Sequence, residues 1–212
     1  MIELRGIGLD FGERSVLDDF NLSISEGEKV VIRGKSGTGK SSLLRLVLGF
    51  VQPSRGEVSY RGQPLSPEIA WSLRREVAYV NQGVDLESGT VATALSAICR
   101  LRSCDAPPET AAMKEALAVF EFDASQLSQK TSELSGGEQQ RIALAAALLL
   151  QREIVILDEP TASLDEGLTN VVAQYFLETY PGTTLVVSHD DAWFQPERAT
   201  IVNFDTLKSI AA

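Results

Sequence analysis

Hydrophobic residues alternate with polar ones over residues 20–24, a pattern that is typical of a half-buried strand. A short apolar run at residues 30–32 predicts a second strand, which stops at Gly34. Leucine and valine then recur at helical spacing as far as Gly49, and residues 57–61 have the pattern of another strand. The first third of the chain is therefore expected to consist mainly of strands, with one helix among them.

The middle of the chain, from about residue 90 to residue 150, has the spacing of helices, and Pro107 and Pro108 form its main break. This segment has the character of a helical insertion, because strands return after it. The later strands are predicted at residues 154–157, 184–187 and 200–204, with a helix at residues 168–177. Strands that alternate with helices predict an α/β fold with a mostly parallel sheet covered on both faces.

A chain of 212 residues is long enough to bury one proper core, and we expect a single domain. Its net charge of −10 argues against nucleic acid as a partner, because phosphate backbones need a basic face. No apolar stretch approaches the roughly 20 residues that cross a bilayer, and the first residues lack the pattern of a secretory signal. Cys99 and Cys104 are too close in sequence for a disulfide framework and are expected to be reduced thiols.

The segment GKSGTGKS at residues 34–41 fits the phosphate-loop pattern G-x-x-x-x-G-K-[ST], between a predicted strand and a predicted helix. Its glycines let backbone N–H groups converge on a phosphate, and the helix presents its positive end there. Lys40 is then expected to reach the terminal phosphates of ATP, and the Ser41 hydroxyl to bind Mg²⁺. The nucleotide-binding residues predicted here are Gly34, Ser36, Gly37, Thr38, Gly39, Lys40, Ser41 and Ser42.

The alternative for this segment is a plain glycine-rich turn between strand and helix. Such a turn would leave Lys40 in the first turn of a helix, where the helix dipole disfavours a cation by about 0.3–1 kcal/mol. A bound anion removes this conflict, so the phosphate loop is the favoured interpretation.

Two adjacent acids, Asp158 and Glu159, follow the apolar strand predicted at residues 154–157. Neighbouring carboxylates at the end of a buried strand are electrostatically unfavourable unless a cation lies nearby. With MgATP in the site, Asp158 is expected to hold the Mg²⁺ shell and Glu159 to polarise the attacking water. The alternative is a pair of solvated acids at a strand end.

The octet LSGGEQQR at residues 134–141 has the local form of a capping box, with Ser135 as the N-cap and Glu138 three residues later. Between a phosphate loop and an Asp-Glu-Pro segment, however, it resembles the signature of the ATP-binding cassette (ABC) ATPases. The resemblance extends from Phe11 to His189, which is nearly the whole chain. It implies a P-loop NTPase core with a mostly parallel sheet, an N-terminal antiparallel β subdomain and an inserted helical subdomain.

The resemblance also implies roles for single residues. Phe11 matches the aromatic side chain that stacks on adenine, and Gln82 resembles the glutamine that links the γ-phosphate to the helical insertion. Residues 163–165 resemble a loop that crosses to the partner subunit, and His189 resembles the switch histidine that contacts the γ-phosphate. The expected catalytic residues are Lys40, Gln82, Glu159 and His189, and the expected Mg²⁺ ligands are Ser41, Gln82 and Asp158.

A two-subunit engine is the mechanism that the resemblance implies. ATP on the phosphate loop of one copy would be capped by the signature residues Ser135, Gly136, Gly137 and Glu138 of a second copy. The core is expected at residues 1–82 and 151–212 and the helical subdomain at residues 83–150. The expected partners are a second copy and an integral-membrane permease, which would place the chain in the cytoplasm on the inner face of the membrane.

Two alternatives stay open at this point. One is a soluble ABC ATPase in a non-transport role, such as cofactor assembly or cell-envelope signalling. The other is an inactive binding module, which is disfavoured because Lys40, Asp158, Glu159 and His189 are all present.

Overall fold

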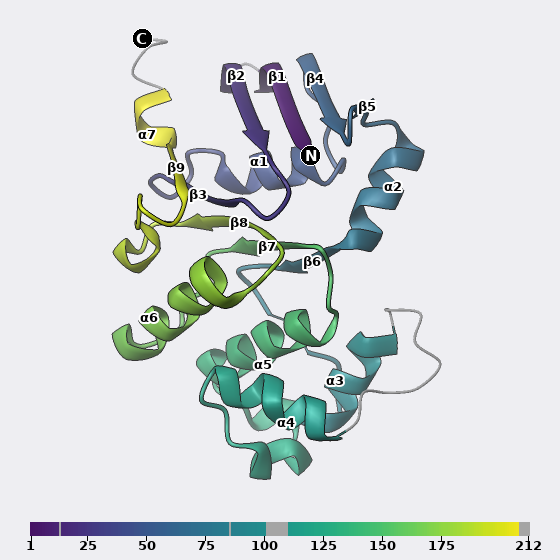
Figure 1. Ribbon diagram of the computed structural model, residues 1–212, viewed down its shortest axis with the longest axis vertical. Coiled ribbons are helices and arrows are strands. Elements are labelled where there is room, and N and C mark those ends of the chain that lie inside the picture. Colours follow the sequence, from purple (N-terminus) through teal and green to yellow (C-terminus); the bar gives the residue numbers. More distant parts are fainter. Residues whose placement is uncertain (13, 85, 101–109, 208–212) are drawn as a thin grey trace.

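Two β-sheets form the framework of the fold, which a computed structural model describes for residues 1–12, 14–84, 86–100 and 110–207 (Figure 1). The antiparallel sheet has the strand order β2-β1-β4-β5 and consists of β1 (Ile2–Phe11), β2 (Arg14–Ile24), β4 (Arg55–Tyr60) and β5 (Gln63–Pro64). The parallel sheet has the order β6-β7-β8-β3-β9 and consists of β3 (Lys29–Arg33), β6 (Val77–Val80), β7 (Ile154–Asp158), β8 (Thr183–Ser188) and β9 (Thr200–Asn203).

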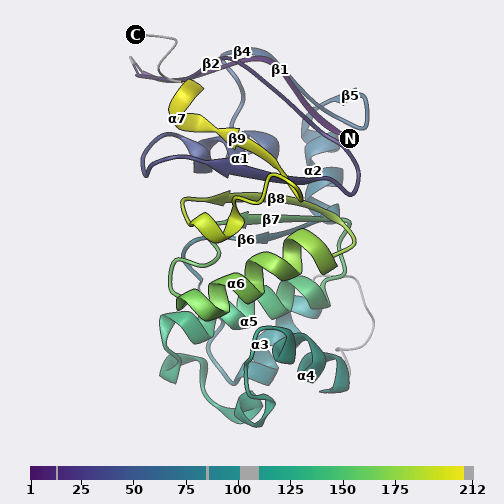
Figure 2. The same ribbon diagram turned by 60° about the vertical axis from the view of Figure 1, so that its left-hand side comes forward.

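The helices lie in layers around the parallel sheet. They are α1 (Lys40–Val47), α2 (Pro67–Glu76), α3 (Val91–Arg100), α4 (Thr110–Val119), α5 (Gly136–Leu149), α6 (Glu166–Gln174) and α7 (Phe204–Leu207). Helix α1 lies between the two sheets, and α5 and α6 cover the opposite face of the parallel sheet (Figures 1 and 2). Helices α3 and α4 pack beyond them, at the end of the molecule that is farthest from the antiparallel sheet.

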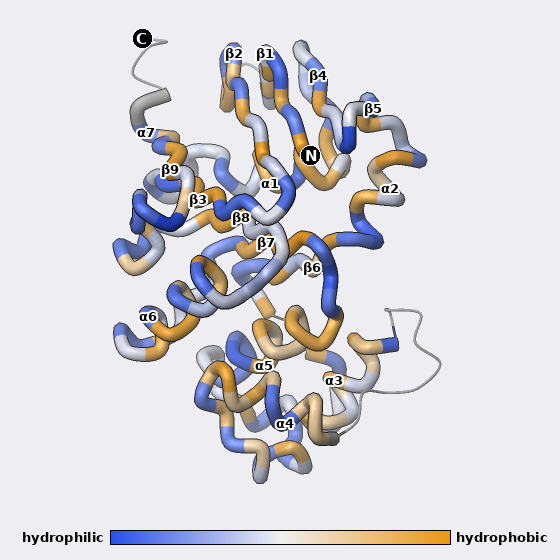
Figure 3. Tube along the Cα trace, viewed as in Figure 1, coloured by the Kyte–Doolittle hydropathy of each residue, from blue (hydrophilic) through white to orange (hydrophobic). Residues whose placement is uncertain are grey.

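The two faces of the parallel sheet define two hydrophobic cores. Along β7, Ile154 and Ile156 belong to the core that contains α1, whereas Val155 and Leu157 belong to the core that contains α5. Successive side chains of a strand point to opposite faces, so a fully buried strand needs an uninterrupted apolar run. The strands of the antiparallel sheet instead alternate in hydropathy along their length (Figure 3), because only one of their faces is buried.

Capping residues fix where the site-forming helices begin. Gly39 precedes α1 with a left-handed backbone (φ 105°), and Ser135 accepts a hydrogen bond from Glu138 N at the start of α5. Helix α2 begins after Ser66, which accepts from Ile69 N, and it has Pro67 in its first turn. The pattern of the sequence predicted no helix at α2.

The structure confirms the predicted parallel sheet and shifts several element bounds. The strand predicted at residues 20–24 is the end of the longer β2, and the strand predicted at residues 200–204 stops at Asn203, where α7 follows. The helix predicted at residues 168–177 is α6, which continues into a π-helical turn at Tyr175–Thr179. Short 3₁₀ turns occur at Ala124–Ser128, Thr131–Glu133 and Asp191–Trp193.

Three residues of the sequence analysis, Cys104, Pro107 and Pro108, lie outside the described residues. Cys99 is buried on α3. Among the residues that the structure describes, none of the helices is both long and apolar enough to span a bilayer.

Candidate nucleotide-binding site

The phosphate loop joins β3 to α1 at the edge of the parallel sheet where the strands end. Gly37 and Gly39 have φ angles of 75° and 105°, a conformation that favours glycine. A Cβ atom on Gly39 would also clash with the side chain of Val16. The backbone of the loop therefore needs glycine at position 39 for two separate reasons.

Lys40 is buried and folds back over its own loop. Its Nζ atom donates hydrogen bonds to the carbonyl oxygens of Gly34 (2.6 Å) and Lys35 (3.0 Å), and lies 3.4 Å from Oε1 of Glu159. Only 5% of the Lys40 surface is exposed, so its positive charge is compensated inside the protein rather than by water. A phosphate group could replace these partners of Nζ without a further cost for removing water from the cation.

Asp158 lies at the end of β7 with its carboxylate between two hydroxyl groups. Ser41 Oγ donates to Oδ1 at 3.3 Å, and the hydroxyl of Tyr79 lies 3.5 Å from Oδ2. Burial raises the pKa of Asp158, the hydrogen bond from Ser41 offsets part of that rise, and the negative charge of Glu159 adds to it. Burial and the nearby Asp158 charge also raise the pKa of Tyr79 to about 12, so this hydroxyl keeps its proton at neutral pH.

Glu159 and His189 follow the neighbouring strands β7 and β8 and meet in front of the loop. Oε2 of Glu159 lies 2.8 Å from Nδ1 of His189 and accepts a longer hydrogen bond, 3.3 Å, from the His189 backbone N–H. The backbone of Glu159 is left-handed (φ 49°), and its N–H donates to the Val187 carbonyl oxygen at 2.8 Å. A non-glycine residue persists in this region only where its surroundings hold it, and the hydrogen bond to Val187 does so here.

Most of the predicted site residues line one cavity of about 380 Å³. Its lining consists of Val16, Ser36, Gly37, Gly39, Lys40, Ser41, Ser42, Gln82, Glu159 and His189. Asp158 lines an adjacent cavity of about 360 Å³, which it shares with Ser41 and Gln82. The structure thus brings together residues that are up to 173 positions apart in the chain, from Val16 to His189.

Some residues that were predicted to bind the nucleotide do not line this cavity. Gly34 is the carbonyl partner of Lys40, and Thr38 Oγ1 donates to the Lys35 carbonyl oxygen at 2.8 Å, so both shape the loop from within. Val16, which no sequence motif marked, forms part of the cavity wall. The side chain of Phe11 is outside the described part of the structure.

The signature residues lie apart from this cavity. Ser135 and Glu138 form the predicted capping box: Ser135 N donates to Glu138 Oε2 at 2.8 Å, and Glu138 N donates to Ser135 Oγ at 3.3 Å. A Cβ on Gly137 would lie 2.8 Å from the Ser163 carbonyl oxygen, so the start of α5 packs closely against that loop. None of Ser135, Gly136, Gly137 and Glu138 is among the described residues that line the phosphate-loop cavity.

This fold and this cavity define an ATP-binding cassette. The family model described as "ABC transporter" matches residues 17–162, and the chain therefore belongs to this family. The chain is an ABC ATPase, which confirms the fold class and the ATP-hydrolysing activity that the signature octet predicted.

Individual relatives agree with this assignment. The ergothioneine transport ATP-binding protein EgtV of Helicobacter pylori is 31% identical over 215 residues, which cover 98% of this chain and 99% of that protein. The ATP-dependent lipid A-core flippase of Methylococcus capsulatus is 38% identical over 197 residues, and the match covers 89% of this chain but 33% of the flippase. The Fe(3+) ions import ATP-binding protein FbpC of Escherichia coli K12 is 31% identical, and the match covers 55% of it. The chain thus spans a third to about half of two of these relatives and nearly all of EgtV.

Solved structures give the same result. The dimeric structure of MJ0796, a bacterial ABC transporter cassette, has a TM-score of 0.79 and 28% identity, with 96% of this chain and 94% of that chain covered. A dimeric post-hydrolysis state of the same cassette, bound to ADP and Pi, has a TM-score of 0.75 and 29% identity and covers 90% and 88% of the two chains.

Proposed function

We propose that this chain is the ATP-hydrolysing subunit of a membrane transporter and that it works as a pair of copies with ATP between them. One observation carries the proposal. The cavity gathers the phosphate loop, Gln82, Glu159 and His189, whereas the signature residues at the start of α5 lie elsewhere on the same chain. A second copy can bring its own α5 N-terminus to the open side of the cavity, and the dimeric state of the related cassette supports this arrangement.

The side chains of the cavity suit MgATP. Loop backbone N–H groups and Lys40 would hold the phosphates, with Lys40 exchanging its present carbonyl partners for phosphate oxygens. Mg²⁺ prefers few protein ligands, all oxygen, and completes its shell with water and phosphate. Ser41, Asp158 and Gln82 meet at the cavity edge and offer such oxygens, and a bound Mg²⁺ would neutralise charge on the phosphates.

Water activation is assigned to Glu159. Its Oε2 atom is held by His189 and its Oε1 atom lies 3.4 Å from Lys40, so the carboxylate is oriented beside the place where the terminal phosphate would lie. Glu159 would accept a proton from the attacking water, while His189 keeps the carboxylate in place. Lys40 and the opposing signature helix N-terminus would stabilise the charge that develops on the phosphoryl group.

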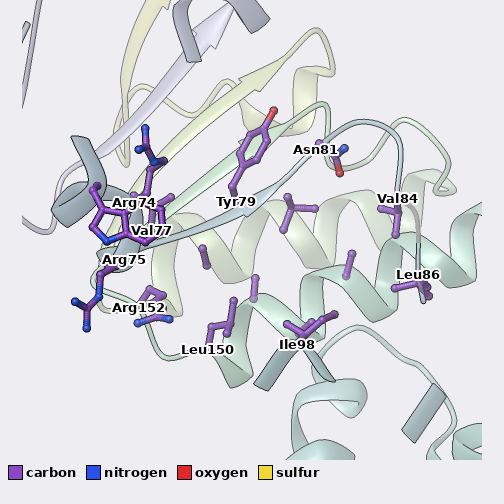
Figure 4. A pocket seen from close by; sticks show the side chains of 16 residues that line it. Arg74, Arg75, Val77, Tyr79, Asn81, Val84, Leu86, Ile98, Leu150 and Arg152 are labelled. Atoms are coloured by element: carbon purple, nitrogen blue, oxygen red, sulfur yellow. The ribbon is translucent and has the colours of Figure 1, made fainter. Parts of the chain in front are cut away.

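A groove of about 600 Å³ on another face fits a segment of a membrane subunit. It lies between α2, β6 and the helices α3 and α5, with Arg74, Arg75 and Arg152 at one end and Val84, Leu86 and Ile98 at the other (Figure 4). Tyr79 and Asn81 line both this groove and the cavity that contains Asp158 and Gln82. A partner helix seated here would therefore contact residues that also border the nucleotide site.

Charge and exposure favour an amphipathic helix with acidic residues as the occupant. The described lining includes three arginines and no acid, although the whole chain carries a net charge of −10. Trp71, at the rim, is 63% exposed and would bury an apolar surface on docking. On docking, the predicted core (residues 1–82 and 151–212) and the predicted helical subdomain (residues 83–150) would move relative to each other. The chain would lie on the cytoplasmic side of the membrane.

Co-purification tests the transport role. The tagged chain is solubilised from membranes in mild detergent, and we expect it to retain a multispanning membrane protein. Trp71→Ser should weaken this association and leave ATP binding unchanged, because Trp71 does not line the phosphate-loop cavity. An active ATPase found wholly in the soluble fraction, with no membrane partner, would contradict the proposal and favour a non-transport role.

A further inference from the structure

The last strand and the last helix meet the phosphate loop at the edge of the parallel sheet. Strand β9 pairs in parallel with β3, with Asn203 opposite Arg33. The residues after β9 therefore emerge beside Gly34 and Lys35, which follow β3, and α7 starts directly there (Figure 2). Two of these residues, Phe204 and Asp205, contact the start of the loop.

Phe204 anchors α7 beneath the loop. It is 1% exposed and packs edge-to-face on Phe20, with ring centroids 5.5 Å apart. A Cβ atom on Gly34 would lie 2.9 Å from the Cβ atom of Phe204, which is closer than two such atoms can approach. The backbone of the loop and the start of α7 are thus in close contact.

Asp205 holds one side of Lys35 through a backbone hydrogen bond. Its Oδ1 atom accepts from the Lys35 N–H at 3.0 Å, and its own N–H donates to Oδ1 of Asn203 at 2.9 Å. On the other side, the Lys35 carbonyl oxygen accepts from Thr38 Oγ1 at 2.8 Å and from Lys40 Nζ at 3.0 Å. The peptide groups on both sides of Lys35 are therefore fixed.

In the nucleotide complex proposed above, Lys40 would turn to a phosphate. The Lys35 carbonyl oxygen would then lose its contact with Nζ and keep the contact with Thr38, and the Lys35 N–H would keep its contact with Asp205. We propose that Asp205 is a positioning residue for the phosphate loop, which it holds in the binding conformation through the Lys35 N–H. The proposal rests on the phosphate-binding role of the loop given above.

A loop that is already ordered binds its ligand without a further loss of conformational entropy. Loss of the Asp205 contact should therefore weaken MgATP binding and have little effect on the chemical step, which depends on Glu159 and His189. The required property is a hydrogen-bond acceptor at the position of Oδ1, not a negative charge, so the amide of asparagine can replace the carboxylate.

The test compares Asp205→Ala with Asp205→Asn in steady-state turnover of MgATP and in the binding of fluorescent methylanthraniloyl-ATP. We expect Asp205→Ala to raise KM and Kd by about three- to tenfold, as for one lost hydrogen bond, with kcat changed by less than about twofold. Asp205→Asn should stay within about twofold of the wild type. Asp191→Ala removes an exposed acid that pairs with Arg33 at the same sheet edge, and it serves as the charge control.

Two results would overturn the proposal. If Asp205→Ala binds MgATP as the wild type does, the contact does not position the loop. If Asp205→Asn is as weak as Asp205→Ala, charge and not hydrogen bonding is responsible. Asp205→Leu, which is close to aspartate in size and has no hydrogen-bond acceptor, repeats the test if the alanine variant does not fold.

Lys40→Ala in the same binding assay separates this proposal from the proposed function. If Lys40→Ala loses methylanthraniloyl-ATP binding, the loop is the phosphate site, and an unaffected Asp205→Ala removes only the positioning role. If Lys40→Ala binds as the wild type does, the proposed function itself fails.

Discussion

Nδ1 of His189 lies 2.8 Å from Oε2 of Glu159, although the two residues are 30 positions apart in the chain. The contact exists because β7 and β8 are parallel neighbours, with Asp158 paired to Val187, so both residues follow strand ends at the same edge. The same glutamate reaches Lys40 with its other oxygen. Glu159 is therefore the residue that connects the phosphate loop to the histidine.

Glu159→Gln is expected to retain ATP binding and to lose hydrolysis. The amide keeps the size of the side chain but cannot accept the proton of the attacking water, so kcat should fall by at least about 100-fold. Binding should be as tight or tighter, because the carboxylate no longer competes with phosphate for Lys40. Single-turnover hydrolysis and light scattering with ATP should reveal an inactive, ATP-bound dimer. Near-normal turnover would remove Glu159 from the water-activating role.

His189→Ala should lower kcat by about 10- to 100-fold and change the KM for MgATP much less, because the variant loses the contact that orients Glu159. His189 is the sole histidine of the chain, and its side chain is 66% exposed. Diethyl pyrocarbonate, which modifies histidine, should therefore inactivate the wild type in proportion to one modified residue. Full activity after complete modification would contradict the role of His189.

Ser135→Arg should separate nucleotide binding from turnover. The variant loses the capping box and places a cation at the start of α5, which the helix dipole disfavours, but it leaves the phosphate-loop cavity of the same chain intact. We expect methylanthraniloyl-ATP to bind as in the wild type while turnover falls by at least about tenfold, because the opposing copy can no longer cap the nucleotide.

Mixing two inactive variants tests whether the site is shared between copies. A dimer of one Ser135→Arg chain and one Lys40→Ala chain contains one complete site, formed by the loop of the first and the signature of the second. The mixture should regain part of the turnover that neither variant has alone. A mixture that never exceeds the sum of its components would indicate that each chain carries its own complete site.

Local patterns in the sequence were sufficient to predict the phosphate loop, the two acids and the capping box, because each consists of consecutive residues at a strand or helix end. The meeting of Glu159 and His189 also follows from topology, since parallel strands end at one edge. Helix α2 was missed although Ser66 and Pro67 are good start signals, because only Ala70 and Leu73 are buried and the apolar pattern is weak.

Other contacts between distant residues could not be predicted. Val16 lines the nucleotide cavity, yet in the sequence it is one more apolar residue on an alternating strand. Asp205 contacts a backbone N–H that is 170 positions earlier in the chain, and no local pattern marks an acid for that role. Such residues become visible only when the order of the strands in the sheet is known.

Lys29 should make the free energy of unfolding rise with pH in the alkaline range. Its Nζ atom donates to the carbonyl oxygens of Tyr180 (2.6 Å) and Gly182 and to Oγ1 of Thr184 (3.3 Å), and burial lowers its pKa from 10.5 to about 8. Between these two values the unfolded chain binds more protons than the folded one. The free energy of unfolding should therefore rise with pH from about 8 towards 10.5, by less than the roughly 1.4 kcal/mol per pH unit that one proton allows.

Urea unfolding of the wild type and of Lys29→Met at pH 7.5 and pH 9.5 isolates this contribution. Titrating groups that make no contact with Lys29 affect both proteins alike. As the pH rises, the free energy of unfolding should increase more for the wild type than for Lys29→Met. Only the wild type has a buried ammonium group that loses its proton in this range. Lys130→Met changes an exposed lysine, and its free energy of unfolding should change with pH as that of the wild type does. An equal response of the wild type and Lys29→Met would mean that the carbonyl oxygens around Nζ compensate fully for its burial.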